Sequence, residues 1–252
     1  MNVVVLGSGS CAPTRRRGSS GILVYTDAAV LLLDGGAAVV EKLVQTGRSY
    51  TDLSAVLYTH LHCDHAAGLI PLLFAINNTP GYRRSDPFLI YGPAGVDTLL
   101  MRLTNAWPKP WLAPEGYAIR VTQMKRGEFA VGDIVGRSIP VEHAGLDCIG
   151  YRLESGGVVL AYSGDTGECD GVVELGRGAD LLILECSHPD GVELPGHLTP
   201  SQAGRVASAA GAKRLLLTHM YADCDDVDVA AQCRKEFSGE ITVAEDLMEI
   251  VV

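Results

Sequence analysis

Histidines and aspartates gather in one short segment of this chain. Thr59-His60-Leu61-His62-Cys63-Asp64-His65 places three imidazoles and a carboxylate within six residues. The segment directly follows the apolar run 55–58, which predicts a buried strand that ends here. Imidazole nitrogens and carboxylate oxygens are good ligands for zinc and its borderline-soft neighbours. Alternating spacing after a strand would aim the first two histidines at one ion, while the aspartate and the third histidine reach a second.

Three further apolar runs end in side chains of the same kind. Ile139-Pro140-Val141-Glu142 leads into His143, the run 158–162 leads through Ser163-Gly164 into Asp165, and the run 215–218 leads into His219. Buried strands that carry polar side chains at their ends are a common way for a rigid core to position chemistry on loops. Any one of these could be a core histidine or a capping aspartate, but together they supply ligands for two ions.

The series His60-x-His62-x-Asp64-His65 with His143, Asp165 and His219 resembles the binuclear hydrolases of the metallo-β-lactamase superfamily. The resemblance implies two metal ions, with Asp165 bridging them. One ion would be held by His60, His62 and His143, and the other by Asp64, His65 and His219. Zinc is the expected metal, although ligands of nitrogen and oxygen alone would also accept manganese or iron. The β-lactamases proper generally carry cysteine or another residue where Asp165 stands, so the bridging carboxylate argues against that activity.

Other segments are similar to ribonuclease Z, the tRNA 3′-processing endonuclease family. They are 3–14, Arg17-Gly18-Ser19-Ser20, Leu33-Asp34-Gly35-Gly36, Leu184-Glu185 and Gly196-His197-Leu198-Thr199, and the resemblance spans roughly residues 1–220. It implies that Glu185 and His197 act together on the scissile phosphate. Asp64 would orient the attacking water as well as bind metal. Asp34 is expected to support a ligand imidazole by accepting a hydrogen bond from it.

The segment around His197 predicts a helix start. Thr199 at the N-cap, Pro200 at the first helical position and Gln202 at the third form a capping box. Free backbone N–H groups at such a terminus favour an anion such as phosphate. A loop histidine that merely helps to cap the helix is the alternative. For His188, contact with substrate and a supporting or exposed position are equally open.

Two features argue against tRNA as the substrate. Ribonuclease Z enzymes usually carry a long arm that grips tRNA, in many bacterial members between the third histidine motif and the bridging aspartate. Here residues 144–164 predict only a hairpin around Ser155-Gly156-Gly157. The formal net charge is −10 and the pI about 5.1, whereas nucleic-acid binding usually requires a basic surface. The arginines of Arg15-Arg16-Arg17 and Arg83-Arg84 are expected to lie in solvated loops rather than to contact phosphate.

Three functions therefore compete. The first is a ribonuclease Z-like RNA endonuclease, and the second is a small-molecule, cyclic-nucleotide or ribose-phosphate phosphodiesterase with the same metals. The third is a binding domain without catalysis, against which the complete ligand set argues. Seven cysteines without a Cys-x-x-Cys pair indicate reduced thiols, and neither a membrane span nor a signal peptide is apparent, so a cytoplasmic location is expected. The sequence leaves a homodimer open.

Residues 1–252 are expected to form one α/β domain. Strands are predicted at 3–6, 21–25, 30–34, 55–58, 88–91, 117–123, 134–141, 148–153, 158–162, 181–185, 214–218 and 241–243. Helices are predicted at 37–46, 69–76, 96–105, 201–210 and 227–237. This order, strands then helices twice over, predicts a four-layer αββα sandwich, the fold that the resemblance also implies.

Overall fold

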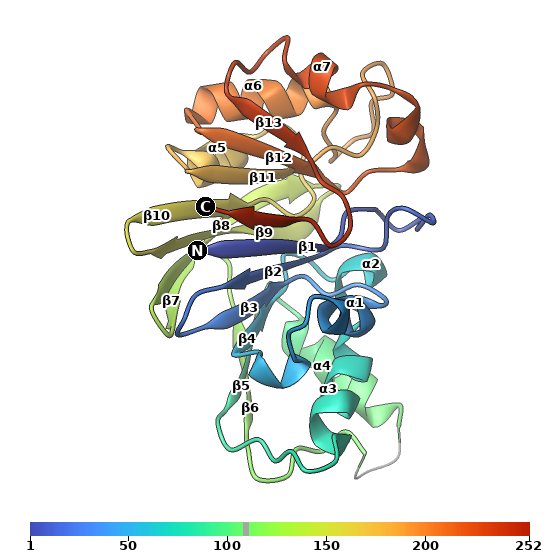
Figure 1. Ribbon diagram of the computed structural model, residues 1–252, viewed down its shortest axis with the longest axis vertical. Helices are drawn as coiled ribbons and strands as arrows, with labels where there is room; N and C mark the ends of the chain where they lie inside the picture. Colours follow the sequence, from blue (N-terminus) through green and yellow to red (C-terminus); the bar gives the residue numbers. More distant parts are fainter. Residues whose placement is uncertain (108–110) are drawn as a thin grey trace.

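Two seven-stranded sheets packed face to face form the centre of the computed structural model, which describes residues 1–107 and 111–252 (Figure 1). The first sheet has the strand order β14 (Glu249–Val251), β1 (Asn2–Gly7), β2 (Gly21–Tyr25), β3 (Val30–Leu33), β4 (Ala55–Leu57), β5 (Phe88–Gly92) and β6 (Ile119–Gln123). The second has the order β13 (Glu240–Val243), β12 (Arg214–Thr218), β11 (Leu181–Glu185), β10 (Val158–Tyr162), β9 (Leu146–Ser155), β8 (Ile134–His143) and β7 (Gly127–Val131).

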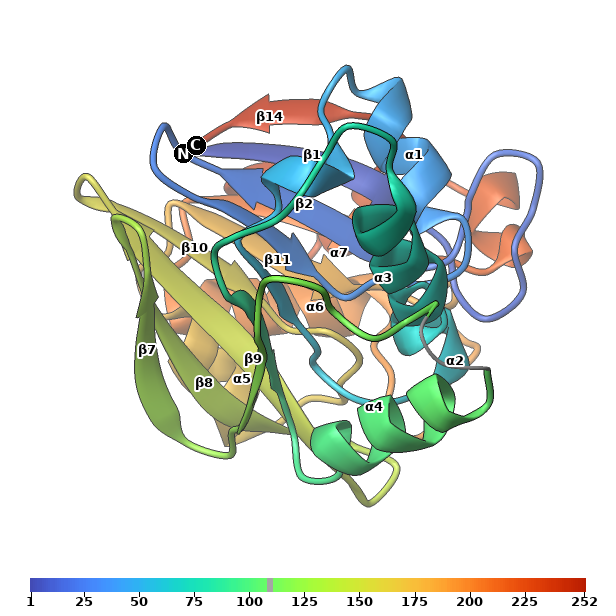
Figure 2. The same ribbon diagram turned by 90° about the horizontal axis from the view of Figure 1, so that it is seen from below.

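Helices cover the outer face of each sheet (Figures 1 and 2). The first sheet is covered by α1 (Val39–Gln45), α2 (Cys63–Ala66), α3 (Leu69–Asn78) and α4 (Val96–Asn105), and the second by α5 (Asp170–Gly176), α6 (Pro200–Ala210) and α7 (Val229–Cys233). Two short 3₁₀ turns, Tyr50–Asp52 and Ala222–Asp226, complete the elements. The predicted αββα sandwich is confirmed.

Three apolar layers hold the four layers of structure together. On β1, Val3 and Val5 belong to the cluster between the sheets, whereas Val4 and Leu6 belong to the cluster beneath α1 and α3. A strand that is buried on both faces needs apolar residues at consecutive positions, which explains the unbroken run in this strand. A third cluster fills the space between the second sheet and α5 to α7.

The structure adds elements that the sequence pattern did not predict and shortens one that it did. The strands β7 and β14 and the short helices α2 and α5 were not predicted. The helix expected over 227–237 is confined to α7, because Val227 is extended and Asp228 caps the helix by accepting a hydrogen bond from the backbone N–H of Ala231. The hairpin prediction is confirmed: Ser155 pairs with Val158 around Gly156 and Gly157, which have φ of 59° and 81°. Among the described residues, no helix combines the length and apolarity that crossing a membrane requires.

Candidate active site

Strand direction brings the sequence motifs to one edge of the sandwich. Strands β10, β11 and β12 run parallel, and β8 runs parallel to β10 because each is antiparallel to β9. The carboxyl ends of these four strands therefore meet, and they lead to His143, Asp165, Glu185 and His219. The carboxyl end of β4 reaches the same place, where the backbone N–H of Ile149 donates to the carbonyl of Thr59 (3.0 Å).

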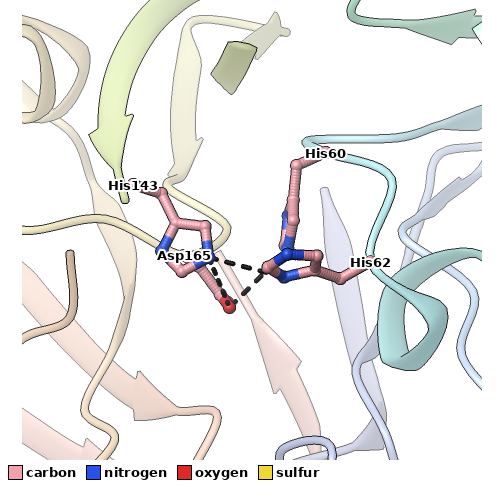
Figure 3. A group of neighbouring side chains, drawn as sticks. All are labelled: His60, His62, His143 and Asp165. Carbon is pink, nitrogen blue, oxygen red and sulfur yellow. Dashed lines mark hydrogen bonds and ion pairs between the residues drawn. The ribbon is translucent and has the colours of Figure 1, made fainter. Parts of the chain in front are cut away.

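His60, His62, His143 and Asp165 form the first group of candidate ligands. Their side chains point toward one another (Figure 3), and one ligand atom from each lies within 4.8 Å of all the others. Nε2 of His143 is 3.4 Å from Nδ1 of His62 and 3.9 Å from Oδ2 of Asp165, and Nε2 of His60 is 3.7 Å from that same oxygen. Such spacing around a common point suits one metal ion.

Asp64, His65 and His219 form the second group, again with ligand atoms within 4.8 Å of one another. Nε2 of His219 is 3.4 Å from Oδ2 of Asp64. Oδ1 of Asp165 faces this group, at 3.2 Å from Nε2 of His65 and 3.3 Å from Nε2 of His219. The two oxygens of Asp165 thus face different groups, the arrangement that a bridging carboxylate requires.

The buried atoms of this cluster fit a pair of cations. Nε2 of His60, Nε2 of His65 and Oδ1 of Asp165 are buried and have no hydrogen-bond partner among the described residues. Buried polar atoms without a partner are rare, and a bound cation would satisfy all three. Burial and the charge of neighbouring histidines lower the pKa of His60 to about 2, which leaves its ring neutral and able to bind metal. Burial alone would raise the pKa of Asp165, but the surrounding imidazoles, His219 and His65 first, hold it well below its usual range.

The other ring nitrogen of each buried histidine is anchored. Nδ1 of His143 is 2.8 Å from the carbonyl of Gly196, and Nδ1 of His65 is 2.8 Å from Oδ2 of Asp34. Asp34 therefore lies beneath the candidate ligand His65. Its carboxylate also accepts hydrogen bonds from the backbone N–H of Thr59 and the hydroxyl of Tyr162, both at 2.8 Å. Contacts of this kind fix the tautomer and orientation of a metal-binding imidazole.

Gly36 keeps the second group in place through a close backbone approach. A Cβ at this position would lie 2.2 Å from the carbonyl oxygen of Asp64 and 2.6 Å from Cβ of Ser19. Gly36 belongs to the motif Leu33-Asp34-Gly35-Gly36, which by itself predicts no role for it. Only glycine allows the loop after β3 to pack against the helix that carries Asp64 and His65.

Glu185 and His197 form a hydrogen-bonded pair beside the histidine cluster. Nδ1 of His197 is 2.7 Å from Oε1 of the buried Glu185, whose other oxygen accepts from the hydroxyl of Ser187 (2.7 Å) and the backbone N–H of Leu198 (3.2 Å). Burial opposes protonation of His197, but the hydrogen bond to Glu185 and its charge outweigh burial and raise the pKa of His197. A histidine held in this way can keep a proton and donate it from its other nitrogen.

The capping box beside His197 is confirmed. The side chain of Thr199 accepts from the backbone N–H of Gln202, and the side chain of Gln202 accepts from the backbone N–H of Thr199 (2.7 Å). Because these two residues form the capping box and Asp190 accepts from the backbone N–H of Ser201 (3.0 Å), His197 is not needed as a cap. It also lies within 4.8 Å of Asp165 and His219, so its side chain reaches the region between both groups.

Ser187 is a connecting residue whose role the sequence did not predict. Its hydroxyl contacts Oε2 of Glu185 (2.7 Å), Nδ1 of His197 (3.0 Å) and Nδ1 of His219 (3.1 Å). If its proton is donated to Glu185, its oxygen can accept from Nδ1 of His219, which leaves Nε2 of that ring free for metal. A serine two residues after a strand end carries no signal that distinguishes it from a serine in any loop.

Three residues with open roles now have definite positions. His188 donates from Nδ1 to the carboxylate of Asp223 (2.8 Å) and stacks on Tyr221, outside both candidate ligand groups. Cys63 is exposed. Arg17 does not lie in a solvated loop as predicted: it is buried and bonded to Asp225, because its guanidinium replaces water with four hydrogen bonds to the protein.

Known proteins are similar to this one over nearly the whole length of the chain. Residues 24–220 match the family described as Beta-lactamase superfamily domain. The chain is 31% identical to a ribonuclease Z of Nocardia farcinica over 299 aligned positions, covering 98% of this chain and 96% of the relative. The structure is similar to human tRNase Z, short form (26% identity, TM-score 0.82, covering 100% and 99% of the two chains). It is equally similar to the metallo-β-lactamase fold protein YhfI from Bacillus subtilis (26% identity, TM-score 0.83, covering 99% and 98%). The chain therefore belongs to the β-lactamase superfamily, as a ribonuclease Z-like member.

Proposed function

We propose that this protein is a metal-dependent phosphodiester hydrolase that cleaves RNA by ribonuclease Z-type chemistry. The observation that carries the proposal is the position of Asp165, whose two oxygens face two histidine groups, next to the hydrogen-bonded pair of Glu185 and His197. A phosphodiesterase needs both parts, because one organises the attack and the other assists departure of the leaving oxygen. The relatives named ribonuclease Z support RNA as the substrate.

Each side chain has a distinct role in this proposal. His60, His62 and His143 would hold one divalent ion, Asp64, His65 and His219 the other, and Asp165 both. Zinc is the expected metal, and the ions would supply positive charge to the phosphoryl oxygens and make water a better nucleophile. Asp64 would orient the attacking water, and His197 would protonate the leaving oxygen. Glu185 would keep His197 protonated and correctly oriented. Asp34 would fix the ring orientation of His65.

A second candidate function is hydrolysis of a small or cyclic ribose phosphodiester. The short hairpin between β9 and β10 favours it, because only Gly156 and Gly157 separate the two strands and no arm extends from them. The alignment with the Nocardia relative has 299 positions against 252 residues here, so at least 47 positions of that protein have no counterpart in this chain. The net charge of −10 also gives little general attraction to a large RNA.

One comparison of substrates tests both functions. The zinc-loaded protein would be incubated in parallel with unprocessed tRNA carrying a 3′ trailer, bis(p-nitrophenyl) phosphate and a cyclic ribose phosphate. Cleavage of the tRNA at its trailer supports the first function. Turnover of the cyclic ribose phosphate with intact tRNA would replace it with the second, and failure on all three would refute both.

Further properties belong to the same proposal. Residues 1–252 would act as one hydrolase domain. A cytoplasmic location is supported by the free thiols of all seven cysteines, which suit a reducing compartment. Formation of a homodimer remains a prediction, which sedimentation of the purified protein would test.

A further inference from the structure

One buried hydroxyl connects the second sheet to the support of a candidate ligand. Tyr162 lies on β10, is 2% exposed, and donates from its hydroxyl to Oδ2 of Asp34 (2.8 Å), which follows β3 in the first sheet. Oδ2 of Asp34 in turn lies 2.8 Å from Nδ1 of His65. We infer that Tyr162 is a positioning residue for the second metal ion, the ion of Asp64, His65 and His219, and that it acts through Asp34 on the ring of His65. The inference rests on the proposed function in one respect, because it takes His65 as a ligand of that ion.

Asp34 is a buried anion whose position depends on its hydrogen bonds. Its side chain has no exposed surface, and its backbone has a left-handed φ of 54°, which few residues other than glycine adopt. Oδ1 accepts from the backbone N–H of Thr59 (2.8 Å), and Oδ2 accepts from the hydroxyls of Thr59 (2.9 Å) and Tyr162. A buried carboxylate needs such donors in order to stay charged. Loss of one donor therefore leaves Asp34 less firmly oriented and more easily protonated.

The charge of Asp34 decides which nitrogen of His65 carries the proton. An ionised carboxylate can only accept a hydrogen bond, so the proton lies on Nδ1 of His65 and Nε2 keeps a free lone pair. Nε2 is buried, has no hydrogen-bond partner among the described residues, and lies 3.2 Å from Oδ1 of Asp165. A cation at this point would satisfy both atoms. Any change that loosens or neutralises Asp34 therefore weakens the binding of metal at Nε2.

The surroundings of Tyr162 make its hydroxyl a fixed donor. Burial and the charge of Asp34 raise the pKa of Tyr162 well above its usual range, so the hydroxyl keeps its proton. The ring belongs to the apolar cluster between the sheets, where close packing leaves it little freedom to turn. Thr59 donates to the same oxygen, but its hydroxyl also contacts Nδ1 of His60 (3.1 Å), so its loss would disturb both ions. Tyr162 is therefore the residue at which the effect on the second ion can be isolated.

The metal affinity of Tyr162→Phe tests the inference, and Tyr151→Phe is its matched control. Tyr151 pairs with Tyr162 across β9 and β10, is also buried, and donates to the backbone carbonyl of Tyr58 (3.0 Å) rather than to the support of a ligand. Zinc would be withdrawn by a chelator while nuclear magnetic resonance of ¹⁵N-labelled histidine rings identifies which ligands lose their ion. Tyr162→Phe should weaken binding of the second ion by about tenfold, the lower end of the effect of residues that support a ligand. Binding of the first ion in this variant, and of both ions in Tyr151→Phe, should change by less than about threefold.

A double-mutant cycle shows whether Tyr162 acts through Asp34. Asp34→Ala should by itself weaken binding of the second ion by about tenfold or more. Addition of Tyr162→Phe should then weaken it by less than about a further twofold, because the carboxylate that the hydroxyl orients is already gone. Equal effects of Tyr162→Phe and Tyr151→Phe, or losses that add in the double variant, would overturn the inference.

Hydrolysis by the same preparations separates this inference from the proposed function. If the wild-type protein binds two zinc ions but hydrolyses no diester, and the two tyrosine variants differ as described, the function is refuted and the role of Tyr162 is kept. Hydrolysis of a diester without that difference between the variants would refute the role of Tyr162 and keep the function. A wild-type protein that binds no ion at His65 would refute both.

Discussion

Replacement of His197 by alanine separates proton donation from metal binding. The fold should survive, because Glu185 keeps its hydrogen bonds from the backbone N–H groups of Thr166 (2.9 Å) and Leu198 and from the hydroxyl of Ser187 after the imidazole is removed. The lost hydrogen bond to a charged group is worth about 1.5–3 kcal/mol, and water from the adjoining pocket can replace part of it because the side chain of His197 is 12% exposed. Both metal ions should remain bound, since all seven candidate ligands are untouched.

Activity should nevertheless fall steeply, and to an extent that depends on the leaving group. A positioned general acid contributes about 100-fold to 10,000-fold, equivalent to about 2.7–5.5 kcal/mol of transition-state stabilisation. We expect that loss for a substrate that leaves as an alkoxide. The loss should be much smaller for bis(p-nitrophenyl) phosphate, because p-nitrophenolate departs without a proton. The assay is steady-state kcat/KM for both substrates, together with elemental analysis and thermal unfolding of the variant.

His188→Ala is a matched control for this experiment. Nδ1 of His188 also lies next to a carboxylate oxygen, Oδ2 of Asp223, at 2.8 Å. The side chain of His188 is 18% exposed. It lies outside both candidate ligand groups, so we expect less than about a threefold loss on either substrate. Equal losses on both substrates for His197→Ala, or loss of metal, would make His197 a ligand or a structural residue and refute the reasoning.

The remaining predictions concern the metals, a glycine and a buried arginine. Elemental analysis should find close to two divalent ions per chain, and Asp165→Asn should lose both together with hydrolysis, since this residue alone faces both groups; one ion in fully active protein would contradict the binuclear site. Gly36→Ala should weaken binding of the second ion by tenfold or more in a chelator competition, because its Cβ would lie 2.2 Å from the backbone oxygen of Asp64. Gly35→Ala is the control: the nearest atom to its Cβ would be a side-chain carbon at 3.2 Å, so this change should weaken metal binding less. Arg17→Ala should reduce the free energy of unfolding by about 2–4 kcal/mol in urea denaturation, because it leaves the largely buried carboxylate of Asp225 without its partner. The control is Arg16→Ala, which removes an exposed side chain and should change the free energy of unfolding by less than about 0.5 kcal/mol.

The sequence predicted the parts of the fold and site that local patterns encode. The apolar runs before His60, Asp165 and His219 predicted the strands and, to within one residue, the places where they end, because burial on two faces requires consecutive apolar residues. The strand before His143 was also predicted, although it has exposed residues on one face and extends two residues further than predicted. The capping box at Thr199 could also be predicted, because it depends only on two side chains that are three residues apart in the sequence.

The parts that were missed depend on contacts between distant segments. The burial of Arg17 depends on Asp225, which is 208 residues away. Ser187 acquires its role only because β12 and the loop before α6 bring His219 and His197 to its hydroxyl. The strand β14 has three residues, and its pairing with β1 rather than its own composition defines it.

The pairing of β1 with β14 also bears on how the chain folds as it is synthesised. Asn2, Val3 and Val4 pair with Val251, Ile250 and Glu249, so β1 completes its hydrogen bonds with a strand that is made more than 240 residues later. Contacts between such distant residues make folding slow, and one edge of β1 stays open until residues 249–251 have left the ribosome. An open edge of an apolar strand can pair with other chains. Loss of residues 249–251 should therefore promote aggregation of the nascent protein well before it affects the candidate active site.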